Sequence, residues 1–181
     1  MSFYRSSDHG GTWEELEDTY ELGGAYPRLF VDSQGEVMYL AAGHQQFYSR
    51  DEGSTWLPCK HIRTSVSDQI LAIDPRDNRH LYAATSGMGI LISTNGCQSW
   101  EESNKGLDSF SVSAIVIDPN NPDTLYAGTD GGAYVSYNSG KTWGVINDGL
   151  LGATVVYSIV VDKDSNVYAA TPYGIFKLEG K

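Results

Sequence analysis

The sequence contains little cysteine. Only two of its 181 residues are cysteine, Cys59 and Cys97. Two cysteines cannot build a disulfide framework or a thiolate zinc cluster. Cys59 follows a tryptophan by three residues and Cys97 precedes one by three, which predicts positions near opposite ends of equivalent strands. No disulfide is therefore expected.

Positive charge is also scarce. Lysine and arginine together number 12, against 23 acidic residues, and the formal net charge is −11. Nucleic acids and anionic membrane surfaces both require a basic footprint on their partner. The composition therefore argues against a nucleic-acid or membrane partner.

Several other signals are missing. No apolar run approaches the roughly 20 residues of a membrane span. The first six residues lack the apolar core of a signal peptide, and the compartment stays open. The histidines have no metal-ligand spacing, and no glycine-rich turn precedes a helix that could bind phosphate. We therefore expect no metal and no cofactor.

The four tryptophans mark a repeat. They lie at Trp13, Trp56, Trp100 and Trp143, with gaps of 43, 44 and 43 residues. A constant period in the forties with strand-like sequence between the marks is typical of a fold built one sheet at a time. At this length, residues 1–181 are expected to form a single domain.

The eight residues that end at each tryptophan share the pattern Ser-x-Asp/Asn-x-Gly-x-Thr-Trp. Asp or Asn accepts hydrogen bonds from backbone N–H groups, and glycine allows a positive φ. The third copy has Asn95, Cys97 and Ser99 at the Asp, Gly and Thr positions, so a distorted or weaker turn is expected there. The residues predicted to be structural are Asp8, Trp13, Asp51, Trp56, Asn95, Trp100, Asn138 and Trp143.

This pattern resembles the Asp-box, or bacterial neuraminidase repeat. Before the boxes, Ile73-Asp74-Pro75 and Ile117-Asp118-Pro119 precede Leu-Tyr-Ala strands. This arrangement is most similar to the xyloglucanase-type and sortilin-like members of the group. The resemblance implies a β-propeller, with the boxes on hairpins away from the ligand face.

The segments between boxes predict four short antiparallel strands per unit. In one unit these are 113–117, 124–128, 133–136 and 142–146, with the innermost strand first. The fold class is therefore all-β: a propeller of four-stranded antiparallel blades with Asp-box hairpins, holding about four blades' worth of strands.

The first and the last predicted strands, 3–6 and 174–178, both correspond to the third strand of a blade. The strands therefore do not add up to a whole number of four-stranded blades. Three arrangements accommodate it: a small four-bladed ring with one third strand displaced, an eight-bladed ring shared by two copies, or a segment of a longer propeller. An open arc would expose strand edges, which favours pairing with a partner or with another copy.

Ligands of propellers bind where the loops after the second and fourth strands of each blade meet. On these loops, six aromatic, histidine and arginine residues are candidates for contact with a ligand or partner. They are Tyr20, Tyr26, His44, Arg63, Phe110 and Tyr173.

Catalytic signals are weak. A glycoside hydrolase needs two carboxylates across the scissile bond, and Asp108 and Asp130 are the best-placed acids on the predicted face. If they serve an enzyme, one should lie within about 10 Å of another carboxylate. The resemblance implies that xyloglucanase-type enzymes take their acids from two large propellers, and this chain holds a fraction of one. The arginine triad and Arg-Ile-Pro signature of sialidases are also missing.

The sequence therefore favours a non-catalytic scaffold that presents its loops to a protein or glycan partner, or to another copy of itself. Two alternatives remain. One is a segment of a carbohydrate-active enzyme of xyloglucanase type, and the other is a trimmed form of a larger propeller.

Overall fold

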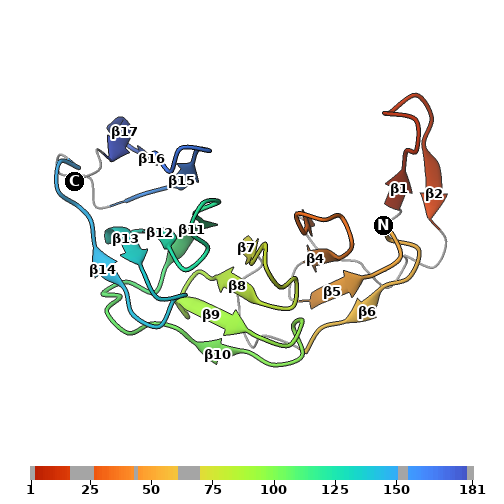
Figure 1. Ribbon diagram of the computed structural model, residues 1–181, viewed down its shortest axis with the longest axis horizontal. Coiled ribbons are helices and arrows are strands. Elements are labelled where there is room, and N and C mark those ends of the chain that lie inside the picture. Colours follow the sequence, from red (N-terminus) through yellow and green to blue (C-terminus); the bar gives the residue numbers. More distant parts are fainter. Residues whose placement is uncertain (1–2, 17–26, 43–44, 61–69, 151–154, 179–181) are drawn as a thin grey trace. The chain divides into compact units, whose positions relative to one another are not determined.

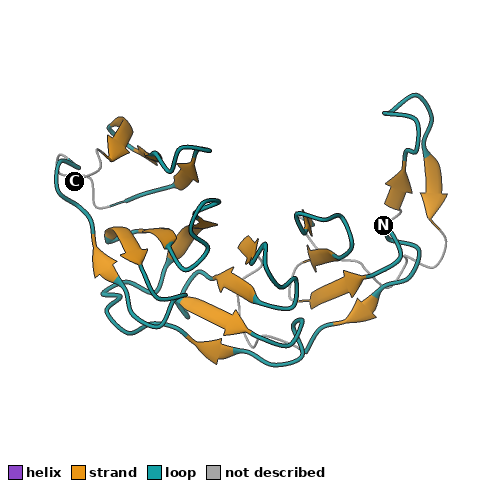
Figure 2. Ribbon diagram, viewed as in Figure 1, coloured by secondary structure: helices purple, strands orange, loops and turns teal. Residues whose placement is uncertain are grey.

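The computed structural model describes residues 3–16, 27–42, 45–60, 70–150 and 155–178. Every regular element in these ranges is a β-strand, and Figure 2 shows only strands and loops. The described part of the chain therefore has no helix long and apolar enough to cross a membrane. The all-β prediction is confirmed.

The chain divides into two compact units, Met1–Ser67 and Asp68–Lys181. In the first unit, β1 (Phe3–Arg5) and β2 (Glu14–Leu16) form a two-stranded antiparallel sheet. A four-stranded antiparallel sheet follows in chain order. Its strands are β3 (Arg28–Val31), β4 (Met38–Ala42), β5 (Gln45–Ser49) and β6 (Leu57–Pro58). The single-domain organisation expected for residues 1–181 stays a prediction.

The second unit contains three sheets (Figure 1). The first consists of β7 (Ile70–Ile73), β8 (Leu81–Ala84), β9 (Ile90–Ser93) and β10 (Glu101–Glu102). The second consists of β11 (Val112–Ile117), β12 (Leu125–Thr129), β13 (Gly132–Ser136) and β14 (Gly144–Val145). The third has three strands, β15 (Ser158–Val161), β16 (Val167–Thr171) and β17 (Gly174–Leu178). Each strand pairs antiparallel with the next, so the predicted blade topology is confirmed.

The inner strands of these three sheets lie side by side, with β11 next to both β7 and β15. Small residues on the middle strands allow this approach. A Cβ atom added at Gly128 would lie 2.8 Å from the Val156 side chain. The core fills the spaces between sheets: Tyr82, Leu125 and Tyr134 are almost fully buried between the first two.

The turns at residues 6–13, 49–56, 93–100 and 136–143, called the box turns below, share one set of hydrogen bonds. In the second, the Ser49 hydroxyl accepts from Gly53 N at 2.9 Å and donates to Asp51 at 2.8 Å. Asp51 also accepts from Thr55 N at 2.8 Å and from the Thr55 hydroxyl at 2.6 Å. Asp8, Asn95 and Asn138 accept the equivalent backbone N–H bond. Asn95 and Asn138 differ from the aspartates in one bond, since their amide nitrogens donate to the Ser99 and Thr142 hydroxyls.

The third box turn is not distorted, contrary to the expectation. Each box turn has two consecutive residues with positive φ, such as Ser139 (56°) and Gly140 (81°). In the third turn these are Gly96 (67°) and Cys97 (65°), so the glycine stands one position earlier. The backbone keeps its conformation because Cys97 N still donates to Ser93 Oγ at 3.0 Å.

The expectation of free cysteines is wrong: neither Cys59 nor Cys97 is free, and both are disulfide-bonded. The reasoning failed because neither cysteine lies in a strand. Cys59 follows β6, and Cys97 occupies the buried glycine position of a box turn.

The repeat contains a signal for this disulfide state. Cys59 stands three residues after its tryptophan, like Leu16 and Ser103, whereas Cys97 stands at a box glycine position, like Gly53 and Gly140. These positions touch in the other copies. A Cβ on Gly53 would lie 3.5 Å from Leu16, and the Ser103 hydroxyl donates to the Gly140 carbonyl.

The box tryptophans differ in burial. Trp143 is 5% exposed, Trp56 and Trp100 are partly buried, and Trp13 is 63% exposed. Trp143 Nε1 donates to the carbonyl oxygen of Ser103 at 2.8 Å. The indole of one box turn is therefore fixed to the segment that follows the preceding box turn.

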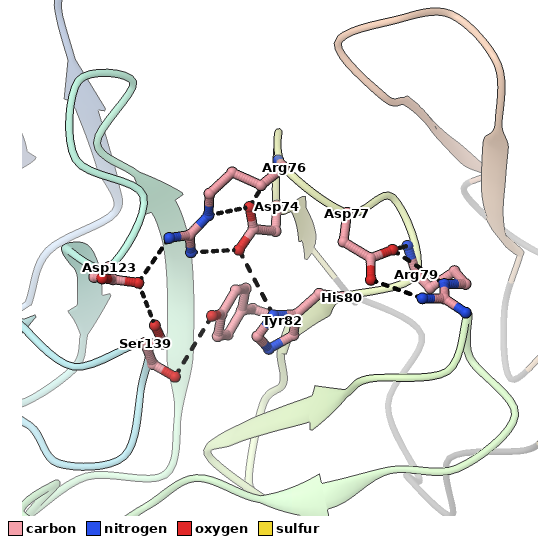
Figure 3. A network of polar contacts seen from close by, with 8 residues as sticks. All are labelled: Asp74, Arg76, Asp77, Arg79, His80, Tyr82, Asp123 and Ser139. Atoms are coloured by element: carbon pink, nitrogen blue, oxygen red, sulfur yellow. Dashed lines mark hydrogen bonds and ion pairs between the residues drawn. The ribbon is translucent and has the colours of Figure 1, made fainter.

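A polar network joins the first two sheets of the second unit (Figure 3). Arg76 donates two side-chain hydrogen bonds to buried Asp74, at 3.0 and 2.7 Å, and one to Asp123 at 2.9 Å. Ser139 in the fourth box turn donates to Asp123 at 2.8 Å. Burial raises the pKa of Asp74, but the hydrogen bonds and charge of Arg76 outweigh it and leave that pKa lowered. Asp74 is thus a structural turn residue.

Candidate functional site

The loops predicted to form a ligand face meet at one end of the strands in the second unit. The turn between β8 and β9 contacts the connection between β10 and β11. Gly87 N and Gly89 N donate to the carbonyl oxygen of Phe110 at 2.7 and 2.9 Å, and Ser86 forms an isolated bridge with Ser111. These bonds fix the backbone of Phe110, while the residue as a whole is 49% exposed.

Asp130 joins the same group. It lies in the turn between β12 and β13, and its backbone N donates to Ser111 O at 3.2 Å. The Ser109 hydroxyl donates to the Asp130 carboxylate. Asp108 precedes Ser109 and is exposed. The structure thus brings Asp108, Phe110 and Asp130 to one end of the sheets, while a catalytic role for either acid stays a prediction.

Tyr173 lies in the turn between β16 and β17, the topological equivalent of the Asp130 turn. Its side chain is 71% exposed, and its backbone N donates to Thr171 Oγ1 at 3.1 Å. The other predicted contact residues, Tyr20, Tyr26, His44 and Arg63, lie outside the described residues.

Two asparagines that the sequence analysis missed shape these turns. Asn147 accepts from Ala133 N at 2.8 Å and donates to Gly131 O at 3.2 Å. Asn104 makes the same pair of bonds with Ile90 N and Met88 O, both at 2.9 Å. Each asparagine follows its box tryptophan by four residues, so the repeat itself carried the signal.

The pair of hydrogen bonds made by Asn147, called the Asn147 clamp below, requires a glycine at position 132. Gly132 has a φ of 119°, and a Cβ atom there would lie 2.2 Å from the Asn147 side-chain oxygen. Only a residue without a Cβ fits between the turn and the amide. The turn that carries Asp130 is therefore held from both sides, by Ser109 and by Asn147.

This face offers an exposed aromatic ring beside exposed carboxylates on a rigid backbone. Aromatic surface with a few fixed polar groups is the usual composition of small-molecule sites. Such an arrangement can stack on the apolar face of a sugar ring and accept hydrogen bonds from its hydroxyl groups. Within the described ranges, no group of three or more His, Cys, Asp or Glu side chains is placed to hold a metal ion.

No protein-family model matches the chain. Among curated proteins, the chain is 25% identical to an oligoxyloglucan-reducing end-specific xyloglucanase of Emericella nidulans. The match covers 77% of this chain but only 22% of that enzyme. The chain thus spans less than a quarter of the length of this relative.

Solved structures show the same fold. A GH74 xyloglucanase from Xanthomonas campestris superposes with a TM-score of 0.76 at 17% identity, over 97% of this chain and 32% of that one. The GH74 enzyme of Niastella koreensis gives 0.73 at 22% identity, again over 97% of this chain and 32% of that one. At these identities the likeness establishes the fold, a β-propeller-like arrangement of antiparallel blades.

Proposed function

We propose that this chain is a β-propeller segment of a xyloglucanase-type glycoside hydrolase and that its loop face binds a xyloglucan chain. The observation that carries the proposal is the 25% identity to the xyloglucanase of Emericella nidulans across 77% of this chain. The comparisons favour this function over a non-catalytic scaffold for a protein partner.

The box turns support the same assignment. We interpret all four as Asp-boxes, because each uses an Asp or Asn side chain to accept the backbone N–H four residues ahead, at 2.8–2.9 Å. In the xyloglucanase type these hairpins lie away from the ligand. This leaves the end that carries Phe110 and Asp130 as the binding face.

The proposed role is glycan binding rather than complete catalysis. Hydrolysis needs a pair of carboxylates on opposite sides of the scissile bond. The chain covers 22% of the relative's length, so the second acid of such a pair can lie in another part of the enzyme. Asp108 and Asp130 are the candidates for the acid that this segment supplies.

Calorimetric titration with xyloglucan oligosaccharides tests this proposal. We expect saturable binding by the wild-type chain and at least roughly tenfold weaker binding by Phe110→Ala, since loss of one stacking ring costs about 1.4 kcal/mol or more. Tyr137→Ala is the matched control, because Tyr137 is an aromatic residue on a box turn and, at 72%, is more exposed than Phe110.

Absence of oligosaccharide binding, or equal loss in both variants, would contradict the proposal. Release of reducing ends by this chain alone would contradict the restriction to binding. In that case Asp108→Asn and Asp130→Asn should each abolish the release if these acids perform the reaction.

A further inference from the structure

A cavity between two sheets of the second unit has no side chain to fill it. It lies between the sheet β11–β14 and the sheet β15–β17, and its walls are mainly apolar. β17 forms one wall, and among the described strands its one pairing partner is β16, so no described strand lies along its other edge. Ile146 and Leu178 belong to the apolar lining, together with six residues that the comparison below uses: Ala133, Leu150, Ile159, Val167, Ala169 and Phe176.

Each of these six residues corresponds, one repeat earlier, to a residue packed in the same core cluster as Trp143. The pairing registers establish the correspondence: Ala169 pairs with Phe176 as Ala127 pairs with Tyr134. The earlier set is Ile90, Leu107, Ile115, Leu125, Ala127 and Tyr134. The cavity therefore reproduces the binding site of a box-turn indole without the indole.

The chain also carries a box tryptophan that is not buried. Trp13 is 63% exposed, whereas Trp143 is 5% exposed. Trp13 precedes β2 as Trp143 precedes β14, so the two differ in their surroundings and not in their place in the repeat. A large exposed indole next to a short two-stranded sheet is typical of a contact surface.

The charged residues of β17 and β2 are also placed to face each other if the two strands pair. In β13, Val135 pairs with Gly144, the residue that follows Trp143. When the repeats are aligned, the residue equivalent to Val135 is Lys177 in β17 and Arg5 in β1. Arg5 pairs with Glu14, the residue after Trp13, and their side chains are 2.8 Å apart. Lys177 can therefore offer Glu14 the same opposite charge that Arg5 offers it.

We propose that two copies of this chain associate by strand exchange. β2 of the second copy leaves its own β1 and pairs with the edge of β17 along which no described strand lies. Its Trp13 then enters the cavity next to Phe176. Its Glu14 then lies opposite Lys177. Exchange of an equivalent element between copies needs no new surface, because each contact already exists once within the chain.

The solution mass over a range of concentrations tests this association. We expect the wild-type mass to rise with concentration from the 19.8 kDa of one chain toward twice that value. Trp13→Ala should weaken the association at least tenfold while leaving the circular dichroism spectrum unchanged. Ala169→Phe fills the cavity and should weaken it similarly, and thermal unfolding of this variant verifies that it is folded.

Charge reversal tests the register. Glu14→Lys and Lys177→Glu should each weaken association, and the double variant should restore it. Lys163→Glu is the matched control, since Lys163 lies in the turn between β15 and β16, its side chain is 87% exposed, and it forms an ion pair with the neighbouring Asp164.

A wild-type mass of one chain at every concentration would overturn the proposal. So would an association that Trp13→Ala leaves intact, because the copies would then meet through another surface. Neither measurement involves a glycan, so the result is independent of the proposed function.

Discussion

Trp143 of one sheet donates its indole N–H to the backbone carbonyl of Ser103, which follows the sheet before it, at 2.8 Å. The same ring is 5% exposed among residues from both sheets. A single side chain thus supplies both apolar burial and a satisfied polar contact between neighbouring sheets.

Replacement of Trp143 by alanine should be strongly destabilising. Loss of a fully buried tryptophan leaves a cavity and costs about 3–5 kcal/mol of the free energy of unfolding. Chemical denaturation followed by circular dichroism measures this. Tyr137→Ala, on the same turn and 72% exposed, should change the free energy by less than about 0.5 kcal/mol. Similar effects of both variants would refute the assigned role of the indole.

Arg76→Ala should destabilise the second unit because it removes side-chain donors from Asp74, whose side chain is 2% exposed. A buried acceptor that loses its partners costs roughly 1–3 kcal/mol. Arg79→Ala is the control, since its ion pair with Asp77 is a local and exposed one, and about 0–1 kcal/mol is expected. Thermal unfolding distinguishes the two, and equal shifts would argue against the network.

The aspartates of the box turns predict that stability depends on pH, and an Asp-to-Asn substitution should change this dependence. Hydrogen bonds from Thr55 lower the pKa of Asp51. A lowered folded-state pKa stabilises the fold above the unfolded-state pKa of about 4, and this contribution is lost as the pH falls through the folded-state pKa. Acidification below pH ~4 should therefore weaken the fold.

Asp51→Asn should make unfolding less sensitive to acid, because Asn95 and Asn138 already accept the same backbone N–H bond without a titrating group. Their amide nitrogens donate to the Ser99 and Thr142 hydroxyls, so an asparagine also keeps a bond to the hydroxyl four residues ahead. Asn138→Asp should increase the sensitivity. Denaturation midpoints at pH 7 and pH 3 measure both variants. A change in the same direction for the two would exclude the carboxylate as the cause.

Gly132→Ala should disturb the turn that carries Asp130. The added Cβ would lie 2.2 Å from the Asn147 amide, and φ is 119°. We expect a loss of about 1–3 kcal/mol through strain and loss of the clamp, together with weaker oligosaccharide binding. Gly144→Ala is the control, because a Cβ there meets nothing within 4 Å. Equal stability of both variants would show that the clamp is not needed.

The strands could be predicted because their signals are local. Runs such as Ser113 to Ile117, the proline turns and the tryptophan period each depend on neighbouring residues, and β11 and β17 appear close to their expected bounds. The fourth strands came out shorter than predicted: 142–146 was expected, whereas β14 holds only Gly144 and Val145. The box turn takes residues 142 and 143, and the strand ends one residue before Ile146.

Contacts between repeats could not be predicted from one copy alone. The Asn147 clamp and the bond from Trp143 to Ser103 both join positions that local patterns treat separately. Each becomes visible only when the copies are aligned and residues at equal positions are compared. Alignment of the copies does not predict the exposure of Trp13, because that exposure depends on which residues pack against the first box turn.

The bond between Trp143 and Ser103 has a consequence for how such a chain can change in length. The indole and its acceptor are 40 residues apart and belong to successive copies. A deletion or duplication that begins or ends between these two residues keeps an indole and its acceptor at equivalent positions only if its length equals a whole repeat. Gain or loss of complete modules should therefore be tolerated, whereas a shorter insertion between Ser103 and Trp143 must be accommodated in a surface loop to keep the donor facing its oxygen.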